Sequence, residues 1–193
     1  MGGVTILRSA GHRRMPWKNG GGETTEIAVF PPDAGLDDFL WRVSMARVAS
    51  DGPFSRFPGV ERTLAILEGA GMALTIDGAE ALVMHRQSPP LVFPADRPTE
   101  ARLIDGPILD LNVMTRRGVT SHRVRRLAIG EQARLDAEAP TTLLLALDPV
   151  EIVGEGRLDR FDAAILSASV EVRADREADA YLIEIRPPAP SAR

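Results

Sequence analysis

Apolar and polar residues alternate with a period of two through much of this chain. Between residues 41 and 48, Trp41 and Val43 fall on one face of an extended segment and Arg42 falls on the other. This period is typical of a β-strand with one buried face, because successive side chains point to opposite sides of a sheet. Such segments recur about every 8–12 residues with Gly and Pro between them, which predicts an all-β sandwich or barrel. The predicted strands are residues 4–8, 24–30, 41–48, 61–67, 72–76, 81–85, 101–104, 108–114, 122–129, 142–147, 150–153, 163–166, 169–173 and 180–185.

The turns between these segments predict how some strands connect. Residues 61–67 and 72–76 are separated by a short glycine-containing turn, so we expect them to form a hairpin. The Asp77–Gly78 pair is a strong hairpin signal and predicts a second turn, leading to residues 81–85. Residues 130–139 are the one segment in which a helix of some length is expected, with a loop as the alternative.

A glycine-rich loop precedes the second predicted strand. Trp17, Lys18 and Asn19 follow one another directly and are themselves followed by three glycines. Glycine lets a ligand or another backbone approach closely, so this loop could hold Lys18 and Asn19 against a ligand. The alternative is a glycine-rich turn with Trp17 as an apolar plug. It is not a phosphate loop, because the lysine precedes the glycines and a strand follows them.

The composition narrows the classes of partner. Of the 193 residues, 44% are apolar and 26% are charged, as in a soluble globular protein. The formal net charge of −4 argues against a general nucleic-acid binder. No secretory signal follows the basic residues near the N-terminus, and no run approaches the roughly 20 apolar residues of a membrane helix. We therefore expect a cytoplasmic protein with no nucleic-acid or membrane partner, as a monomer or a homodimer.

Three stretches within the first 116 residues resemble one known family, HutD/Ves. Their most characteristic parts are Met15-Pro16-Trp17-Lys18-Asn19-Gly20-Gly21-Gly22, Trp41-Arg42-Val43-Ser44-Met45-Ala46 with Asp51-Gly52-Pro53-Phe54-Ser55, and Asp110-Leu111-Asn112-Val113-Met114-Thr115-Arg116. The resemblance implies a bicupin fold, with two cupin-type antiparallel β-barrels in one compact unit. The N-terminal half would be residues 1–116 and the C-terminal half residues 117–193, with strands open to exchange between them. It also implies a connection with bacterial histidine utilization.

The histidines bear on whether this cupin would hold a metal. Many cupins bind a metal through clustered histidines and a glutamate, but here His12, His85 and His122 are far apart in the sequence, and there is no cysteine. A transition-metal site needs clustered ligands. We therefore expect no metal and no other cofactor.

Six polar or aromatic residues form the candidate ligand site. Arginine offers a planar fork that matches a carboxylate, lysine offers a point charge, and asparagine is both donor and acceptor. Together they suit a small carboxylate that carries an amide, imidazole or formyl group. Several alternatives stay open: a solvent-facing Arg42, a structural amide at Asn112, and Trp17 as either a plug or a stacking surface. The candidates are Trp17, Lys18, Asn19, Arg42, Arg62 and Asn112.

The residues and the resemblance together predict a small-molecule-binding protein that modulates histidine utilization. Its expected ligand is a carboxylate intermediate of the urocanate or formyl-glutamate class, held in a polar cupin pocket without metal. The alternative is a metal-independent cupin enzyme acting on a similar carboxylate, with Glu26, Glu61 and His85 as candidate acid–base groups. No nucleophile is paired with a base in the sequence, so no catalytic residue is assigned. A protein-interaction module is a third class.

Overall fold

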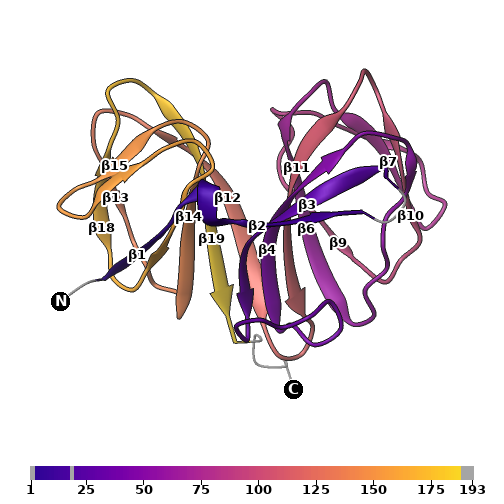
Figure 1. Ribbon diagram of the computed structural model, residues 1–193, viewed down its shortest axis with the longest axis horizontal. Coiled ribbons are helices and arrows are strands. Elements are labelled where there is room, and N and C mark those ends of the chain that lie inside the picture. The colour runs from indigo at the N-terminus through magenta and orange to yellow at the C-terminus, as the bar shows by residue number, and fades with distance from the viewer. Residues whose placement is uncertain (1–2, 18–19, 188–193) are drawn as a thin grey trace. The chain divides into compact units, whose positions relative to one another are not determined.

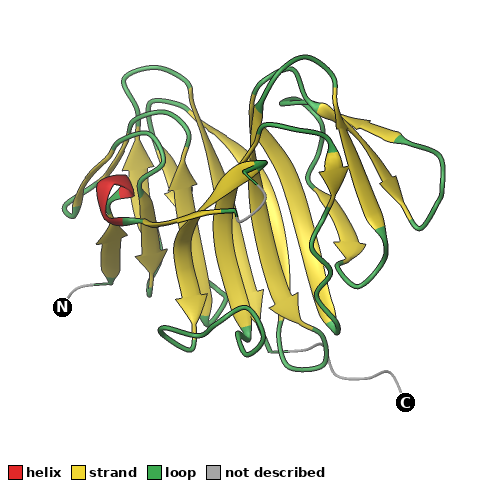
Figure 2. Cartoon of the chain, turned by 45° about the vertical axis from the view of Figure 1, so that its right-hand side comes forward, coloured by secondary structure: helices red, strands yellow, loops and turns green. Residues whose placement is uncertain are grey.

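The regular structure of this chain is almost entirely β. A computed structural model describes residues 3–17 and 20–187. Within these residues there are nineteen strands and one short 3-10 helix, η1 (Ser9–Gly11). Figure 2 shows the strands in yellow and the helix in red. The all-β prediction is therefore confirmed.

The chain forms two compact units (Figure 1). The first unit comprises residues 13–121, and the second comprises residues 3–12 together with residues 122–187. Strand β1 (Val4–Leu7) enters the second unit by pairing antiparallel with β17 (Ala163–Leu166), from Val4 opposite Leu166 to Leu7 opposite Ala163. The units therefore differ from a simple division at residue 116, because the N-terminal strand belongs with the C-terminal part of the chain.

Two antiparallel sheets build the first unit. The larger has, in spatial order, β2 (Arg13–Pro16), β3 (Gly22–Phe30), β4 (Trp41–Val48), β11 (Ile108–Arg116), β6 (Val60–Glu68) and β9 (Leu91–Pro94). The smaller has β5 (Gly52–Pro53), β10 (Thr99–Leu103), β7 (Met72–Ile76) and β8 (Leu82–Met84). Leu64 and Ile66 of the larger sheet and Met72 and Leu74 of the smaller one pack into a single buried cluster. We call the space around this cluster the interior of the first unit.

The second unit repeats this plan with an apolar interior. Its larger sheet has β1, β17, β14 (Thr141–Ala146), β19 (Ala178–Arg186) and β12 (Ser121–Ile129) in spatial order. Its smaller sheet has β13 (Ala133–Leu135), β18 (Val170–Arg173), β15 (Val150–Ile152) and β16 (Gly156–Leu158). Leu144 and Leu182 from the first sheet and Val150, Ile152 and Val172 from the second lie in one apolar cluster. Its burial supplies the main stabilisation of this unit.

The predicted hairpin between residues 61–67 and 72–76 is wrong. Strand β6 pairs with β11 and β9, whereas β7 pairs with β10 and β8 in the other sheet. Gly69 and Gly71 have φ angles of 90° and 115°, a conformation that lets the chain leave one sheet for the other instead of turning back.

The second hairpin prediction is confirmed. Strands β7 and β8 pair antiparallel, with Met72 opposite Met84 and Leu74 opposite Leu82. Asp77 and Gly78 have φ angles of 55° and 71°. Positive φ at two successive turn residues matches the right-handed twist of a two-stranded hairpin.

The helix considered for residues 130–139 is not formed. Ala133–Leu135 is strand β13, paired antiparallel with β18 from Ala133 opposite Val172 to Leu135 opposite Val170. A three-residue strand carries too little periodicity to be seen in the sequence, and β18 supplies the hydrogen-bond partners that decide its conformation.

Candidate functional site

Buried charge distinguishes the interior of the first unit. In the second unit the buried carboxylates of Asp162 and Glu184 each have an arginine partner at 2.7 Å, Arg8 and Arg186 respectively. In the first unit, polar side chains enter the interior itself, and the pairing among them is incomplete. They are Arg42, Ser44, Arg62, Asp110 and Asn112, each at most 8% exposed.

Strand alternation explains why these side chains share one space. Arg42 and Ser44 have the same parity on β4 as Ala46, which lies in the interior cluster. On β11, Asp110 and Asn112 have the parity of the interior residue Ile108. Alternate residues of a strand point to the same face of the sheet, so both sets face inward.

The pairing register then places the polar residues beside one another. Asn112 of β11 lies opposite Ser44 of β4 and opposite Leu64 of β6, and Arg62 of β6 lies opposite Met114. Strands β4, β11 and β6 are adjacent in the sheet, so side chains from distant parts of the sequence converge here.

Arg62 is buried among aromatic rings, and no carboxylate of residues 3–17 or 20–187 forms an ion pair with it. It is 4% exposed, and its guanidinium carbon lies 5.3 Å from the ring centroids of Phe54 and Phe57 and 5.8 Å from that of Phe93. These are cation–π contacts. One terminal nitrogen donates to the Ser55 carbonyl at 3.4 Å and contacts the Met114 sulfur at 3.5 Å. These distances are long for hydrogen bonds.

The guanidinium of Arg62 also has an N–H donor that is not used within the described residues. Its buried Nε has no hydrogen-bond partner among the described residues. Burial lowers the pKa of Arg62 to about 10, with the Asp110 charge opposing and the Arg42 charge adding to this change. The side chain therefore remains a cation at neutral pH and pays the cost of burial with few compensating bonds.

Asp110 and Asn112 form a second polar group on β11. Asn112 Nδ2 donates to Asp110 Oδ1 at 2.6 Å, while the buried Asp110 Oδ2 has no hydrogen-bond partner among the described residues. Burial raises the pKa of Asp110 to about 7, against the lowering effects of the Arg62 charge, the Asn112 amide and the Ala46 N–H. The carboxyl group can therefore gain or lose its proton near neutral pH.

Arg42, in contrast, has a carboxylate partner. Its Nε donates to Glu26 Oε2 at 2.7 Å, and the two side chains are 6% and 11% exposed. The β3–β4 register shifts between Glu26 and Ala28, as expected at a β-bulge, which re-aims a side chain. Arg42 is thus a buried ion-pair partner and not a solvent-facing strand residue.

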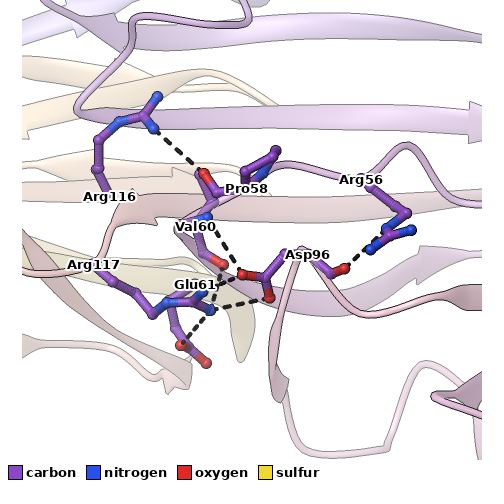
Figure 3. Close-up of polar contacts among 8 residues, drawn as sticks. Arg56, Pro58, Val60, Glu61, Asp96, Arg116 and Arg117 are labelled. Atoms are coloured by element: carbon purple, nitrogen blue, oxygen red, sulfur yellow. Dashed lines mark hydrogen bonds and ion pairs between the residues drawn. The ribbon is translucent and has the colours of Figure 1, made fainter.

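Two of the rings around Arg62 belong to the loop between β5 and β6, and this loop is tied down by polar contacts (Figure 3). Arg56 Nε donates to the Asp96 carbonyl at 2.9 Å, and the Gly59 N–H donates to the Asp96 carboxylate at 3.4 Å. Arg116 donates to the Pro58 carbonyl at 3.4 Å. The contacts hold both ends of the segment that carries Phe57.

Arg117 completes this network, as Figure 3 shows. Its guanidinium pairs with the Asp96 carboxylate and lies 3.9 Å from a Glu61 carboxylate oxygen. The Asp96 partner raises the pKa of Arg117, and Arg117 lowers the pKa of Asp96. Burial raises the pKa of Glu61, opposed by Arg117. We call Arg56, Glu61, Asp96, Arg116 and Arg117 the loop clamp.

The described residues include only part of the glycine-rich loop. Trp17 packs against the interior cluster, and its indole N–H donates to the Thr24 hydroxyl at 2.8 Å. A Cβ atom on Gly22 would lie 3.0 Å from the Trp17 ring and 2.2 Å from the Arg47 carbonyl. A glycine is therefore required at this position for the indole to pack. Lys18 and Asn19 lie outside the described residues.

Arg42, Arg62 and Asn112 thus lie in one interior, with Trp17 against its apolar part. Sequence reasoning left Asp110 out of the candidate site, although its spacing of two from Asn112 placed both on one strand face. Glu26 was considered only as an acid–base group, because its pairing with Arg42 depends on the β3–β4 register.

The other candidate groups lie elsewhere. His85 is exposed and contacts Gln87, while His12 and His122 belong to the second unit. Within residues 3–17 and 20–187, no three His, Cys, Asp or Glu side chains are grouped so that they could hold a metal ion. No helix in this part of the chain has the length and apolar composition needed to cross a membrane.

Solved structures confirm the bicupin prediction. A cupin 2 conserved barrel domain protein from Leptotrichia buccalis superimposes with a TM-score of 0.57 at 13% identity, covering 84% of this chain and 88% of that one. At this identity the similarity concerns the fold alone. HutD from Pseudomonas fluorescens superimposes with a TM-score of 0.83 at 32% identity, covering 96% of this chain and all of that one.

Sequence comparisons lead to the same group. Protein Ves of Citrobacter koseri is 44% identical over 117 residues, which span 58% of this chain and 60% of Ves. An uncharacterised 21.2 kDa protein of Pseudomonas putida, in the hutC 3′ region, is 35% identical over 164 residues, or 81% of each chain. Its location suggests an association with histidine utilization. The HutD family model matches residues 9–182. With motifs, fold and family model in agreement, the chain belongs to the HutD family.

Proposed function

We propose that this chain binds a small carboxylate in the interior of the first unit, without a metal, and thereby modulates histidine utilization. The observation that carries the proposal is Arg62, a 4% exposed cation whose Nε has no partner among the described residues. A buried charge without a counter-ion is costly, whereas a bound carboxylate would supply paired, charge-assisted hydrogen bonds. The three rings contact the guanidinium through cation–π interactions, which do not use its N–H donors.

Two features support a ligand of the urocanate or formyl-glutamate class. The interior offers a cation at Arg62 and an amide–carboxyl pair at Asn112 and Asp110, which suits a small acid with a second polar group. The relative in the hutC 3′ region connects the family with histidine breakdown, where such acids occur. The proposal places the protein in the cytoplasm, with Lys18 and Asn19 as further candidate contacts.

Calorimetric titration tests the proposal with urocanate, N-formyl-glutamate, glutamate and formate. Formate is included because the Pseudomonas fluorescens HutD structure was obtained in a formate condition. We expect Arg62→Lys to weaken binding, since an ammonium cannot form two parallel bonds to a carboxylate. Arg62→Met should weaken it further, by about 10-fold to 150-fold, because a hydrogen bond to a charged group contributes about 1.5–3 kcal/mol.

Arg97→Met is the matched control. Arg97 lies in the same unit but pairs with Asp77 at the surface, where its side chain is 58% exposed. Its replacement should leave binding unchanged. Equal affinities in wild type, Arg62→Lys and Arg62→Met, with folding intact by circular dichroism, would remove Arg62 from the site and contradict the proposal.

A metal-independent enzyme is the second candidate function, and one observation favours it. The pKa of Asp110 is raised to about 7, which suits a general acid or base at neutral pH. Chromatography of the protein incubated with each of the four acids distinguishes an enzyme from a binding protein. Conversion of a bound acid by wild type but not by Asp110→Asn would identify an enzyme, whereas binding without conversion supports a sensor.

A further inference from the structure

Two buried polar atoms in the interior of the first unit have no hydrogen-bond partner among the described residues, and they have opposite hydrogen-bonding character. Arg62 Nε is a donor, and Asp110 Oδ2 is an acceptor when the carboxyl is ionised. Arg62 is 4% exposed and Asp110 is 1% exposed. A buried polar atom without a partner costs about 1–3 kcal/mol, so two in one interior indicate groups that a ligand completes.

The two side chains sense each other's charge without forming an ion pair. Asp110 is the main group that opposes the lowering of the Arg62 pKa, and Arg62 is the main group that opposes the raising of the Asp110 pKa. No contact within 4.0 Å joins them among the described ion pairs, so neither group is the direct partner of the other. Their strands place Arg62 opposite Met114 and Asp110 opposite Ile66, on either side of Asn112.

The neighbouring polar side chains do not supply the missing partners of Arg62 Nε and Asp110 Oδ2. Arg42 faces the interior from β4, but its Nε is engaged with Glu26 of β3 at 2.7 Å. Asn112, on β11 itself, donates to Asp110 Oδ1 and leaves Oδ2 open. The charged side chains that face Asp110 from the described strands are therefore one neutralised pair and the open Arg62.

We propose that Asp110 is a specificity-determining residue, which accepts a hydrogen bond from an N–H group of a ligand whose carboxylate is held by Arg62. This inference rests on the proposed function. It deepens that function by naming the ligand class: a small acid with an imidazole or secondary-amide N–H, and not a carboxylate without a donor. A second carboxylate or an ether oxygen at this place would face Asp110 with two acceptors and no proton between them.

Two pairs of probes of similar shape test the N–H donor. Urocanate carries an imidazole N–H where 3-(2-furyl)acrylate has a furan ring without N–H, and N-formyl-glutamate carries an amide N–H that N-formyl-N-methyl-glutamate lacks. Titrations at pH 8 keep Asp110 largely ionised, since its pKa is about 7. Wild type should bind the donor-bearing member of each pair about tenfold or more tightly, the size expected for a hydrogen bond to a charged group.

Asp110→Asn separates the two halves of the inference, and Asp51→Asn is its control. Asp51 belongs to the same unit but accepts a hydrogen bond from the Leu103 N–H in an exposed position. In Asp110→Asn, affinity for the donor-bearing probes should fall, while affinity for the donor-free acids should hold or rise because a nearby negative charge is gone. Asp51→Asn should change neither.

The outcomes are distinguishable. Wild type could bind the two members of each pair with equal affinity. That result would overturn the role of Asp110 and leave the carboxylate site standing. Parallel losses for both members of a pair in folded Asp110→Asn would do the same, since they would show a structural role. If wild type bound none of the four probes, the proposed function and this inference would both be overturned.

Discussion

Asn112 donates a 2.6 Å hydrogen bond to Asp110, two residues away on the same inward face of β11. This contact orients the carboxyl and satisfies one of its oxygens only. It therefore positions the other oxygen in the interior that also holds Arg62. The strand alternation that normally builds an apolar core here builds a polar group inside one.

The raised pKa of Asp110 predicts a pH-dependent stability. Between the ordinary aspartate pKa near 4 and about 7, the folded protein binds more protons at this site than the unfolded chain. The free energy of unfolding should therefore fall as pH rises through this interval, by up to roughly 4 kcal/mol from this group. Urea denaturation of wild type and Asp110→Asn from pH 4 to pH 8 measures this change in the free energy of unfolding.

The difference between the two curves is the diagnostic quantity. Asp110→Asn cannot titrate, so wild type should lose stability relative to the variant as pH rises from 4 to 7, and the difference should level off above pH 7. Asp51→Asn should run parallel to wild type. A constant difference between wild type and Asp110→Asn over the whole range would show that the carboxyl does not titrate in this interval.

His122 in the second unit predicts the opposite slope. Burial lowers the pKa of His122 to about 4, so between about 4 and 6.5 the unfolded chain binds the proton that the folded protein excludes. The contribution of His122 to the free energy of unfolding should therefore fall as pH drops from 6.5 toward 4, and over this interval it opposes the contribution of Asp110. His122→Gln should flatten this part of the curve, and His85→Gln, at an exposed histidine, should not. Identical acid-side slopes in the three proteins would contradict this prediction.

Gly22 predicts a steric requirement at the glycine-rich loop. A Cβ atom there would lie 2.2 Å from the Arg47 carbonyl oxygen, and backbone must move to relieve the clash. We expect Gly22→Ala to destabilise the fold by about 1–3 kcal/mol, as overpacking does. Gly130→Ala is the control, since a Cβ at Gly130 would meet nothing within 4 Å. Equal denaturation midpoints for the two variants would be the contrary result.

The loop clamp predicts a salt-sensitive contribution to the site. Asp96→Asn removes the carboxylate that pairs with Arg117 and weakens the contact from the Gly59 N–H, while the backbone carbonyl that accepts from Arg56 stays in place. The thermal midpoint should fall, and the difference from wild type should shrink at high salt, because exposed ion pairs are screened. Affinity for the carboxylate should fall with it, since Phe57 rests on the clamped loop beside Arg62.

Asp77→Asn provides the comparison for the clamp. It breaks the Arg97–Asp77 pair, which is also exposed but is not part of the loop clamp. Its effect on stability should be smaller, as for a single surface pair, and binding should be unchanged. Loss of binding in Asp77→Asn as large as in Asp96→Asn would show that the clamp has no special relation to Arg62.

The sequence by itself determined most of the longer strands and the family. Residues 41–48 were predicted as a strand from their alternation and form β4 with the same bounds, and Asp77–Gly78 forms the expected hairpin turn. These features are local, because side-chain period and turn conformation depend on a few neighbouring residues. The motifs of the first 116 residues identified the family, and spacing alone placed Asp110 and Asn112 on one face of their strand.

Only the tertiary structure decided which strands are neighbours, and with them the partners of each charged side chain. It placed β6 beside β11 instead of β7, and it turned residues 133–135 into a strand because β18 offered an edge. It gave Arg42 its partner Glu26 through the β3–β4 register and left Arg62 without a carboxylate. The physical reason is that sheet hydrogen bonds join segments distant in sequence, so the set of side chains that shares an interior depends on pairing that no local pattern encodes.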